Sequence, residues 1–82
     1  MIIKLAKEHG DRLIARSQAK HVVANLDQFS DVSFDFKNIR AVGQGFVDQV
    51  FRVFQNQYPA IKLNYINAND DVDFMIRRGI KP

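Results

Sequence analysis

The hydrophobic pattern changes its period in the middle of the chain, and this change constrains the fold more than any other feature. Between Val32 and Phe36, apolar and polar residues alternate, which is the two-residue period of a β-strand. A polar loop follows. From about Gln44 to Gln57, apolar residues recur at helical spacing and form a wide face. A strand followed by a buried helix is typical of an α/β domain, and we expect this helix to be the most buried one.

The first thirty residues predict a β-hairpin and then a helix. Ile2 to Lys7 is β-prone, and the His9-Gly10-Asp11 tripeptide is a turn signal. Leu13-Ile14 then continues the apolar run, which indicates a second strand of a hairpin. Ser17 is the expected N-cap of a helix that ends near Phe29.

The C-terminal third predicts a strand and a last helix. Ile61 to Asn67 is rich in β-forming residues. Asn69 suits the N-cap of the helix, and Gly79 suits its C-cap. The expected order of elements is therefore ββαβαβα, in one α/β domain over residues 1–82. We expect a four-stranded mixed sheet with three helices.

Composition and charge exclude several classes of protein. The chain has 82 residues, a formal net charge of +3 and no cysteine, so no disulfide or thiolate metal site can form. Basic residues are interleaved with acidic ones, whereas nucleic-acid binders usually concentrate positive charge on one face. No apolar run approaches the roughly 20 residues of a membrane span, and no signal-peptide pattern opens the chain. These features favour a cytoplasmic protein that contacts neither nucleic acid nor membrane.

No set of residues indicates catalysis or metal binding. Asp35 could be a catalytic acid or a metal ligand, but an Asp near a turn more often accepts hydrogen bonds from loop or helix-start amides. No second carboxylate lies at a convincing spacing for paired acid and base chemistry. His9 and His21 fit no metal-ligand pattern. Arg16 either pairs with a nearby acid or belongs to a partner surface. We expect no catalytic residue, no metal ion and no cofactor.

The Gly43-Gln44-Gly45 tripeptide at the helix start allows two interpretations. The glycines let the backbone turn and the helix approach the sheet. Alternatively, helix amides together with Lys37 or Arg40 form a weak anion site. The tripeptide lacks the third glycine and the later acidic residue of a dinucleotide-binding fingerprint, and it lacks the Lys-Ser/Thr pair of a P-loop.

Four segments together resemble the STAS-like family of unknown function, a relative of the anti-sigma factor antagonist (STAS) domain. They are LIARSQAK at Leu13–Lys20, FDFKNIRAVGQGFVDQVFRVF at Phe34–Phe54, IKLNYINAN at Ile61–Asn69 and VDFMIRR at Val72–Arg78. The resemblance implies a cytoplasmic prokaryotic regulatory module, alone or fused to DNA-binding or kinase-type domains. Its partner would be another protein, such as a kinase-type or transcriptional regulator.

The resemblance also implies where a partner docks, with one departure. Anti-sigma factor antagonists carry a phosphorylated serine at the strand-loop-helix junction, but the matching Gly43–Phe46 run has no hydroxyl group. We therefore expect a non-catalytic protein-interaction module that lacks the phosphoacceptor. Its expected partner-binding residues are Lys37, Asn38, Arg40, Gly43, Gln44 and Gly45.

Two other classes of function remain open. A nucleic-acid or anion-binding regulator would be supported by a single basic patch formed by Lys37, Arg40, Arg16 and Lys20. An enzyme would need a deep pocket with convergent polar groups, which so small a domain rarely contains.

Overall fold

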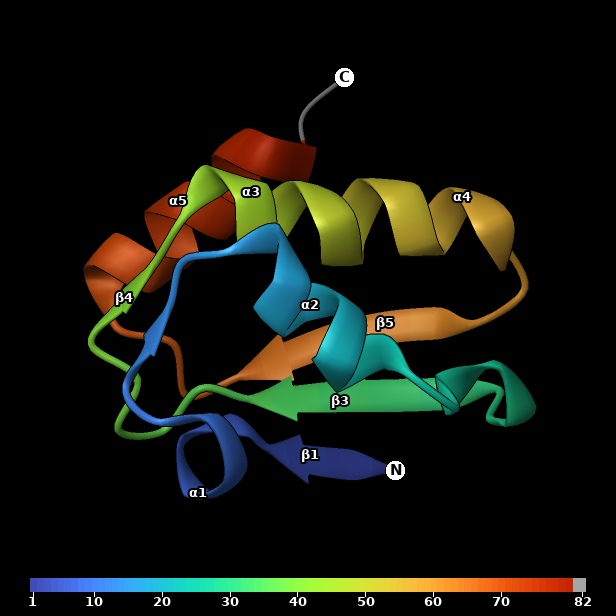
Figure 1. Ribbon diagram of the computed structural model, residues 1–82, viewed down its shortest axis with the longest axis horizontal. Helices are drawn as coiled ribbons and strands as arrows, with labels where there is room; N and C mark the ends of the chain where they lie inside the picture. Colours follow the sequence, from blue (N-terminus) through green and yellow to red (C-terminus); the bar gives the residue numbers. More distant parts are fainter. Residues whose placement is uncertain (81–82) are drawn as a thin grey trace.

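The main layer of the protein is a three-stranded parallel β-sheet (Figure 1). The computed structural model describes residues 1–80, and its central strand is β3 (Asp31–Asp35). β1 (Ile2–Lys4) and β5 (Lys62–Ile66) pair with β3 on either side, both in parallel. Parallel neighbours need crossover connections, which the intervening helices provide. The expected α/β class is confirmed, and β3 and β5 lie where the patterns predict strands.

Helices pack on one side of this sheet (Figure 1). They are α2 (Arg16–Val23), α5 (Asp70–Ile80) and a long helix made of α3 (Gln44–Asp48), the π-helical stretch η2 (Gln49–Phe54) and α4 (Gln55–Gln57). A short helix α1 (Leu5–His9) follows β1, and a 3-10 turn η1 (Leu26–Gln28) follows α2. No helix within residues 1–80 is both long and apolar enough to cross a membrane. The long helix spans the range that its apolar pattern predicts, although the pattern gave no sign of the π-helical turns in its middle.

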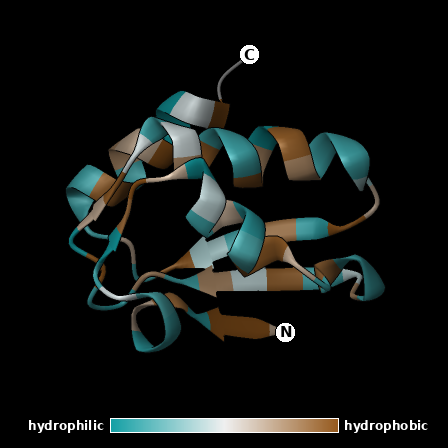
Figure 2. Ribbon diagram, in the orientation of Figure 1, coloured by the Kyte–Doolittle hydropathy of each residue, from teal (hydrophilic) through white to brown (hydrophobic). Residues whose placement is uncertain are grey.

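The hydrophobic core lies between the sheet and the helices. β3 contributes Val32 and Phe34, and the long helix contributes Phe46, Val50 and Phe54, all of them buried. Figure 2 shows apolar residues along the strands and on the long helix. The long helix contributes more buried side chains than α2 or α5, which agrees with the expectation that it is the most buried helix.

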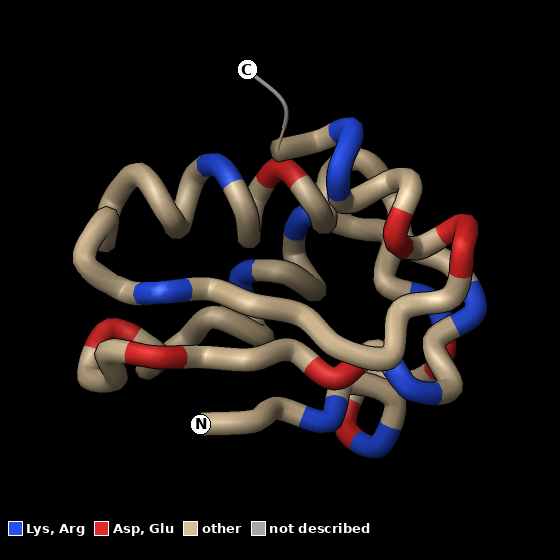
Figure 3. The backbone as a smooth tube through the Cα atoms, turned by 180° about the vertical axis from the view of Figure 1, so that it is seen from behind, with Lys and Arg blue, Asp and Glu red and all other residues tan. Residues whose placement is uncertain are grey.

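The other face of the sheet is open to solvent. Along β5, Lys62, Asn64 and Ile66 are exposed, whereas Leu63 and Tyr65 are half-buried, as expected when successive side chains point to opposite faces. Figure 3 shows the three strands from this side, and no described helix crosses them. Within residues 1–80 the protein therefore has two layers, with α2, α5 and the long helix on the same face of the sheet.

The expected opening hairpin is wrong. β1 ends at Lys4, and Leu5 to His9 forms α1 instead of continuing the strand. β2 (Arg12–Leu13) pairs in parallel with β4 (Ala41–Val42), a strand that the sequence did not suggest, and forms a separate two-stranded sheet. A short apolar run does not distinguish a strand from a helical turn, so the expected four-stranded mixed sheet is replaced by two parallel sheets.

The expectation that Ser17 is the N-cap of α2 is also wrong. α2 begins at Arg16 with Ala15 as its N-cap, so Ser17 lies inside the first turn. The side chain of Gln18 takes the capping role, because its Oε1 accepts hydrogen bonds from the amides of Ile14 and Ala15, both at 2.8 Å. A Gln at this position satisfies helix-start amides in the manner of a capping box.

Gly79 does not end the last helix. α5 continues through it to Ile80, so the expected C-cap is wrong. A Cβ atom at position 79 would lie 2.4 Å from Cγ1 of Val47. The glycine is therefore explained by the close approach of α5 to α3, and not by a turn.

Candidate functional site

The strand-loop-helix junction begins at Asp35, the last residue of β3. Asp35 is a buried carboxylate with 9% of its surface exposed. Its Oδ1 accepts a hydrogen bond from the Lys37 amide at 2.9 Å and another from Nδ2 of Asn67 at 3.0 Å. These two hydrogen bonds, that of Asn67 above all, hold the pKa of Asp35 below its usual value. Asp35 thus ties the start of the loop to the end of β5.

The middle of the loop is held from two sides. The side-chain amide of Asn69 donates to the carbonyl oxygens of Ile39 at 3.2 Å and Arg40 at 3.3 Å, while its Oδ1 accepts from the Val72 amide at 2.8 Å. Asn69 therefore caps α5 and holds the loop at the same time. On the other side, the Arg40 amide donates to the carbonyl of Asp11 at 2.8 Å. With Ile39 buried as an anchor, the loop backbone is fixed along most of its length.

The polar side chains of this loop are left free. Lys37, Asn38, Arg40 and Gln44 are all exposed. None of these side chains makes a hydrogen bond or an ion pair with another residue of the described chain, 1–80. A rigid backbone that presents unused donors and acceptors can bind a partner with little loss of conformational entropy.

The packing around Gly43 leaves no room for a side chain. Its amide donates to the Leu13 carbonyl at 2.8 Å, and a Cβ at this position would lie 2.7 Å from the carbonyl oxygen of Ile14. A Cβ at position 45 would lie 3.6 Å from the same carbonyl oxygen, which is an ordinary van der Waals distance. The φ angle of Gly43 is −102°, so it is the close approach, and not the turn, that calls for glycine. Ile14 itself is 50% exposed beside these glycines.

The expected partner-binding residues form an elongated strip and not one compact loop. Lys37 and Asn38 lie at the carboxyl end of the main sheet. Gln44 lies beyond β4, where it borders a small hollow of about 60 Å³ together with Met75 and Arg78 of α5. Figure 1 shows β4 connecting these two ends along one side of the molecule. We call this surface, from Lys37 to Gly45, the β4 strip.

A groove of about 650 Å³ opens at the lower end of this strip. It lies where the three parallel strands end, since Lys4 is the last residue of β1, Asp35 the last of β3, and Asn67 follows β5. The complete lining is Lys4, Ala6, Lys7, Asp11, Asp35, Lys37, Asn38 and Asn67. Ligands of open parallel sheets usually bind outside the carboxyl ends of the strands.

Sequence reasoning missed most of this groove. Lys4, Lys7 and Asn67 were not among the candidate residues, because the expected hairpin placed the first two on a strand away from the junction. The signal that points to them is that a parallel sheet brings together the residues that end each strand. Without the parallel pairing of β1 with β3, that signal could not be used.

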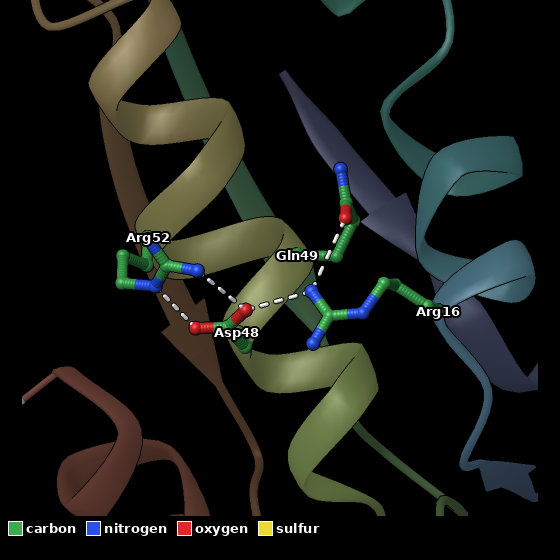
Figure 4. Close-up of polar contacts among 4 residues, drawn as sticks. All are labelled: Arg16, Asp48, Gln49 and Arg52. Carbon is green, nitrogen blue, oxygen red and sulfur yellow. Dashed lines mark hydrogen bonds and ion pairs between the residues drawn. The ribbon is translucent and has the colours of Figure 1, made fainter.

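Arg16 is occupied in an ion-pair network (Figure 4). Its Nη1 donates to Oδ2 of Asp48 at 2.7 Å, and Nη2 of Arg52 donates to the same oxygen at 2.9 Å. Arg52 Nε also pairs with Oδ1 of Asp48. Hydrogen bonds from Arg52, and then from Arg16, keep the pKa of Asp48 well below its usual range. The network joins α2 to the long helix, so Arg16 serves the fold.

The two histidines are brought together, but without a metal site. The rings of His9 and His21 meet edge to face with centroids 6.1 Å apart, which joins α1 to α2. Within residues 1–80, no group of three or more His, Cys, Asp or Glu side chains is placed to hold a metal ion.

These features define a class of protein: a small α/β domain in which a rigid polar loop joins the central parallel strand to the buried helix. The family model of the STAS-like domain of unknown function matches residues 18–73, and the chain belongs to this family. Comparison with curated proteins and with solved structures gave no match. The matched segment includes the β4 strip, whereas Lys4, Lys7 and Asp11 of the groove lie outside it.

Proposed function

We propose that this chain is a non-catalytic regulatory module of the prokaryotic cytoplasm that binds another protein through the β4 strip and the start of α3. One observation carries this proposal. The backbone of the strip is fixed by Asp35, Asn69 and Asp11, while its exposed polar side chains have no partner within residues 1–80. Because folding already orders the loop, binding a partner there loses little further conformational entropy.

The strip also offers the usual composition of an interface. Arg40 can form two parallel hydrogen bonds with a carboxylate, and Arg is enriched among residues that dominate binding energy. Ile14, half exposed beside Gly43, supplies an apolar contact next to the polar Gln44. An apolar centre with a polar rim is typical of protein interfaces.

Regulation by serine phosphorylation at the junction is not part of this proposal, because Gly43 to Phe46 carries no hydroxyl. The serines of the chain are Ser17 in the first turn of α2, Ser30 before β3 and Ser33 within β3. Incubation with a kinase that acts on anti-sigma factor antagonists should leave the intact mass unchanged. Stoichiometric phosphate on any serine would contradict a module without a phosphoswitch.

The strip is tested by Arg40→Glu combined with Gln44→Lys. Both side chains are exposed and unpaired within residues 1–80, so the circular dichroism spectrum and the thermal midpoint should hardly change. The partner is first identified by affinity capture from the native cell with mass spectrometry and then purified. Its affinity for the double variant should fall at least tenfold, which is about 1.4 kcal/mol.

A matched control makes the same charge changes elsewhere. Lys62→Glu with Asn64→Lys places them on the open face of β5, where both residues are exposed. The control should bind the partner like the unmodified chain. If the Arg40 and Gln44 variant folds normally and binds as tightly as the control, the partner docks elsewhere, and the surface near Lys20 and His21 on α2 becomes the next candidate.

A further inference from the structure

Three lysine side chains around the groove are not used by the fold. Lys4, Lys7 and Lys37 all line it. None of their ammonium groups makes a hydrogen bond or an ion pair with any residue from 1 to 80. Three arginines on the helices differ in this respect, since Arg16, Arg52 and Arg77 each pair with an aspartate. Figure 3 shows several basic and acidic segments close together near the ends of the strands, besides other basic segments elsewhere on the chain.

Asp35 provides the opposite chemistry at the same place. Both of its hydrogen bonds go to Oδ1, so Oδ2 of this buried carboxylate has no partner within the described chain. Oδ2 is nevertheless not sealed from solvent, because no buried side-chain oxygen or nitrogen among the described residues lacks a partner. Since Asp35 also lines the groove, this oxygen can accept a hydrogen bond from a molecule inside it.

The charges of the groove select against a simple cation. Three lysines against Asp11 and Asp35 leave an excess positive charge of one. A metal ion would need several oxygen ligands, whereas the lysines repel it. An anion can approach the lysines, but it must also avoid the carboxylate of Asp35. A suitable ligand therefore carries an anionic group at one end and a hydrogen-bond donor at the other.

We propose that this groove is a binding site for a small phosphate-bearing molecule that also carries hydroxyl groups, such as a sugar phosphate. The phosphate lies among Lys4, Lys7 and Lys37, and a hydroxyl donates to Oδ2 of Asp35.

The size of the groove favours a small molecule over a macromolecule. A volume of about 650 Å³ lies in the usual range of roughly 300–1,000 Å³ for small-molecule sites. Nucleic acid would need an extended basic face. The single basic patch that would support nucleic-acid binding is not formed, because Arg16 is bound to Asp48 and Gln49 on the helical side, while Lys37 lines the groove.

The site is tested by titrating the full chain with four probes while recording amide signals by nuclear magnetic resonance. The probes are ribose 5-phosphate, ribose, inorganic phosphate and a short phosphoserine peptide. Ribose 5-phosphate should shift and saturate the signals of Lys4, Lys7, Lys37, Asn38 and Asn67. It should bind at least tenfold more tightly than inorganic phosphate, since only the sugar phosphate can place a separate hydroxyl donor at Asp35 while its phosphate lies among the lysines. Ribose alone should cause no shifts.

Two double variants with equal loss of charge complete the test. Lys4→Gln with Lys7→Gln lies outside the β4 strip and should weaken binding of ribose 5-phosphate at least tenfold. Lys20→Gln with Lys62→Gln, which are exposed residues outside the groove, should leave it unchanged. Equal losses in both variants would show a non-specific charge effect and overturn the site. If the phosphopeptide binds most tightly of the four probes, the assignment of the groove to a small molecule is wrong. If inorganic phosphate binds as tightly as ribose 5-phosphate, the proposed hydrogen bond from a ligand hydroxyl to Asp35 is wrong.

The site does not depend on the proposed protein partner. The Arg40→Glu and Gln44→Lys changes do not touch the lining of the groove, and the Lys4 and Lys7 changes do not touch the β4 strip. The two proposals can therefore fail separately.

Discussion

Gly79 of α5 lies directly against Val47 of α3, so that a single added carbon at position 79 would fall 2.4 Å from Cγ1 of the valine. Real carbon atoms do not approach so closely, and valine is stiff at χ1. The contact therefore sets how near the last helix comes to the long helix, and α5 in turn supports the loop through Asn69.

Gly79→Ala should destabilise the protein although alanine is the better helix former. The gain in helix propensity is about 1 kcal/mol, whereas overpacking costs about 1–3 kcal/mol. Denaturant unfolding should show a lower free energy of unfolding than for the unmodified chain. In a Val47→Ala background, Gly79→Ala should lower the free energy of unfolding by less, because the clashing methyl group is gone. An equal cost in both backgrounds would show that the two helices do not meet here.

Gly43→Ala should be destabilising by about 1–3 kcal/mol, while Gly45→Ala should be neutral or stabilising. A Cβ at position 43 meets the Ile14 backbone oxygen at 2.7 Å, and backbone cannot rotate away as a side chain can. A Cβ at position 45 would lie 3.6 Å from the same oxygen, which is an ordinary contact, and Gly45 lies within the helix α3, where alanine is favoured. Thermal and denaturant midpoints of the two variants provide the comparison, and a reversed order would rule out the close approach of the junction to Ile14.

Phe46→Ala should cost about 3–5 kcal/mol, which is enough to unfold a domain of this size under ordinary conditions. Phe46 is 1% exposed in the centre of the core. Phe74→Ala is the matched control, since Phe74 is 58% exposed on α5 and should cost little. Phe51, which the apolar pattern places on the same buried face, is only half-buried, so its truncation should fall between these two. Similar midpoints for the Phe46 and Phe74 variants would disprove the position of the long helix.

Asp48→Asn should make the protein less stable at neutral pH but not at low pH. The pKa of Asp48 in the folded state lies below its unfolded value of about 3.9, because two guanidinium groups bind the carboxylate. Its stabilising effect is therefore fully present above the unfolded pKa and is lost as the pH falls through the folded pKa. The difference in free energy of unfolding between the unmodified chain and the variant should narrow below about pH 4.

The control for the ion-pair network is Asp27→Asn. Asp27 is exposed in η1 and makes no ion pair within the described residues, so this change should leave the stability close to that of the unmodified chain. If the Asp48 variant shows a pH-independent difference instead, the carboxylate does not gain its stability from Arg16 and Arg52.

β3, β5, α5 and the extent of the long helix could be predicted from the sequence alone, whereas β4 could not. The alternation before Phe36 and the helical spacing after Gln44 are local periodicities, and each is long enough to identify one type of element. The capping of α5 by Asn69 could be predicted for the same reason, because a cap is satisfied by amides within three residues of it. The polar loop between β3 and the long helix also follows directly from the chain.

Only the tertiary structure decided how the first strands pair and what their ends form. Ile2 to Lys7 is compatible with a strand or a helical turn, and the outcome depends on burial of Leu5 and on pairing with β3, about thirty residues away. The groove exists because parallel pairing gathers Lys4, Asp35 and Asn67 at the carboxyl ends of the three strands. Close contacts such as that of Gly79 with Val47 are likewise set by packing between distant segments, which leaves no local pattern in the sequence.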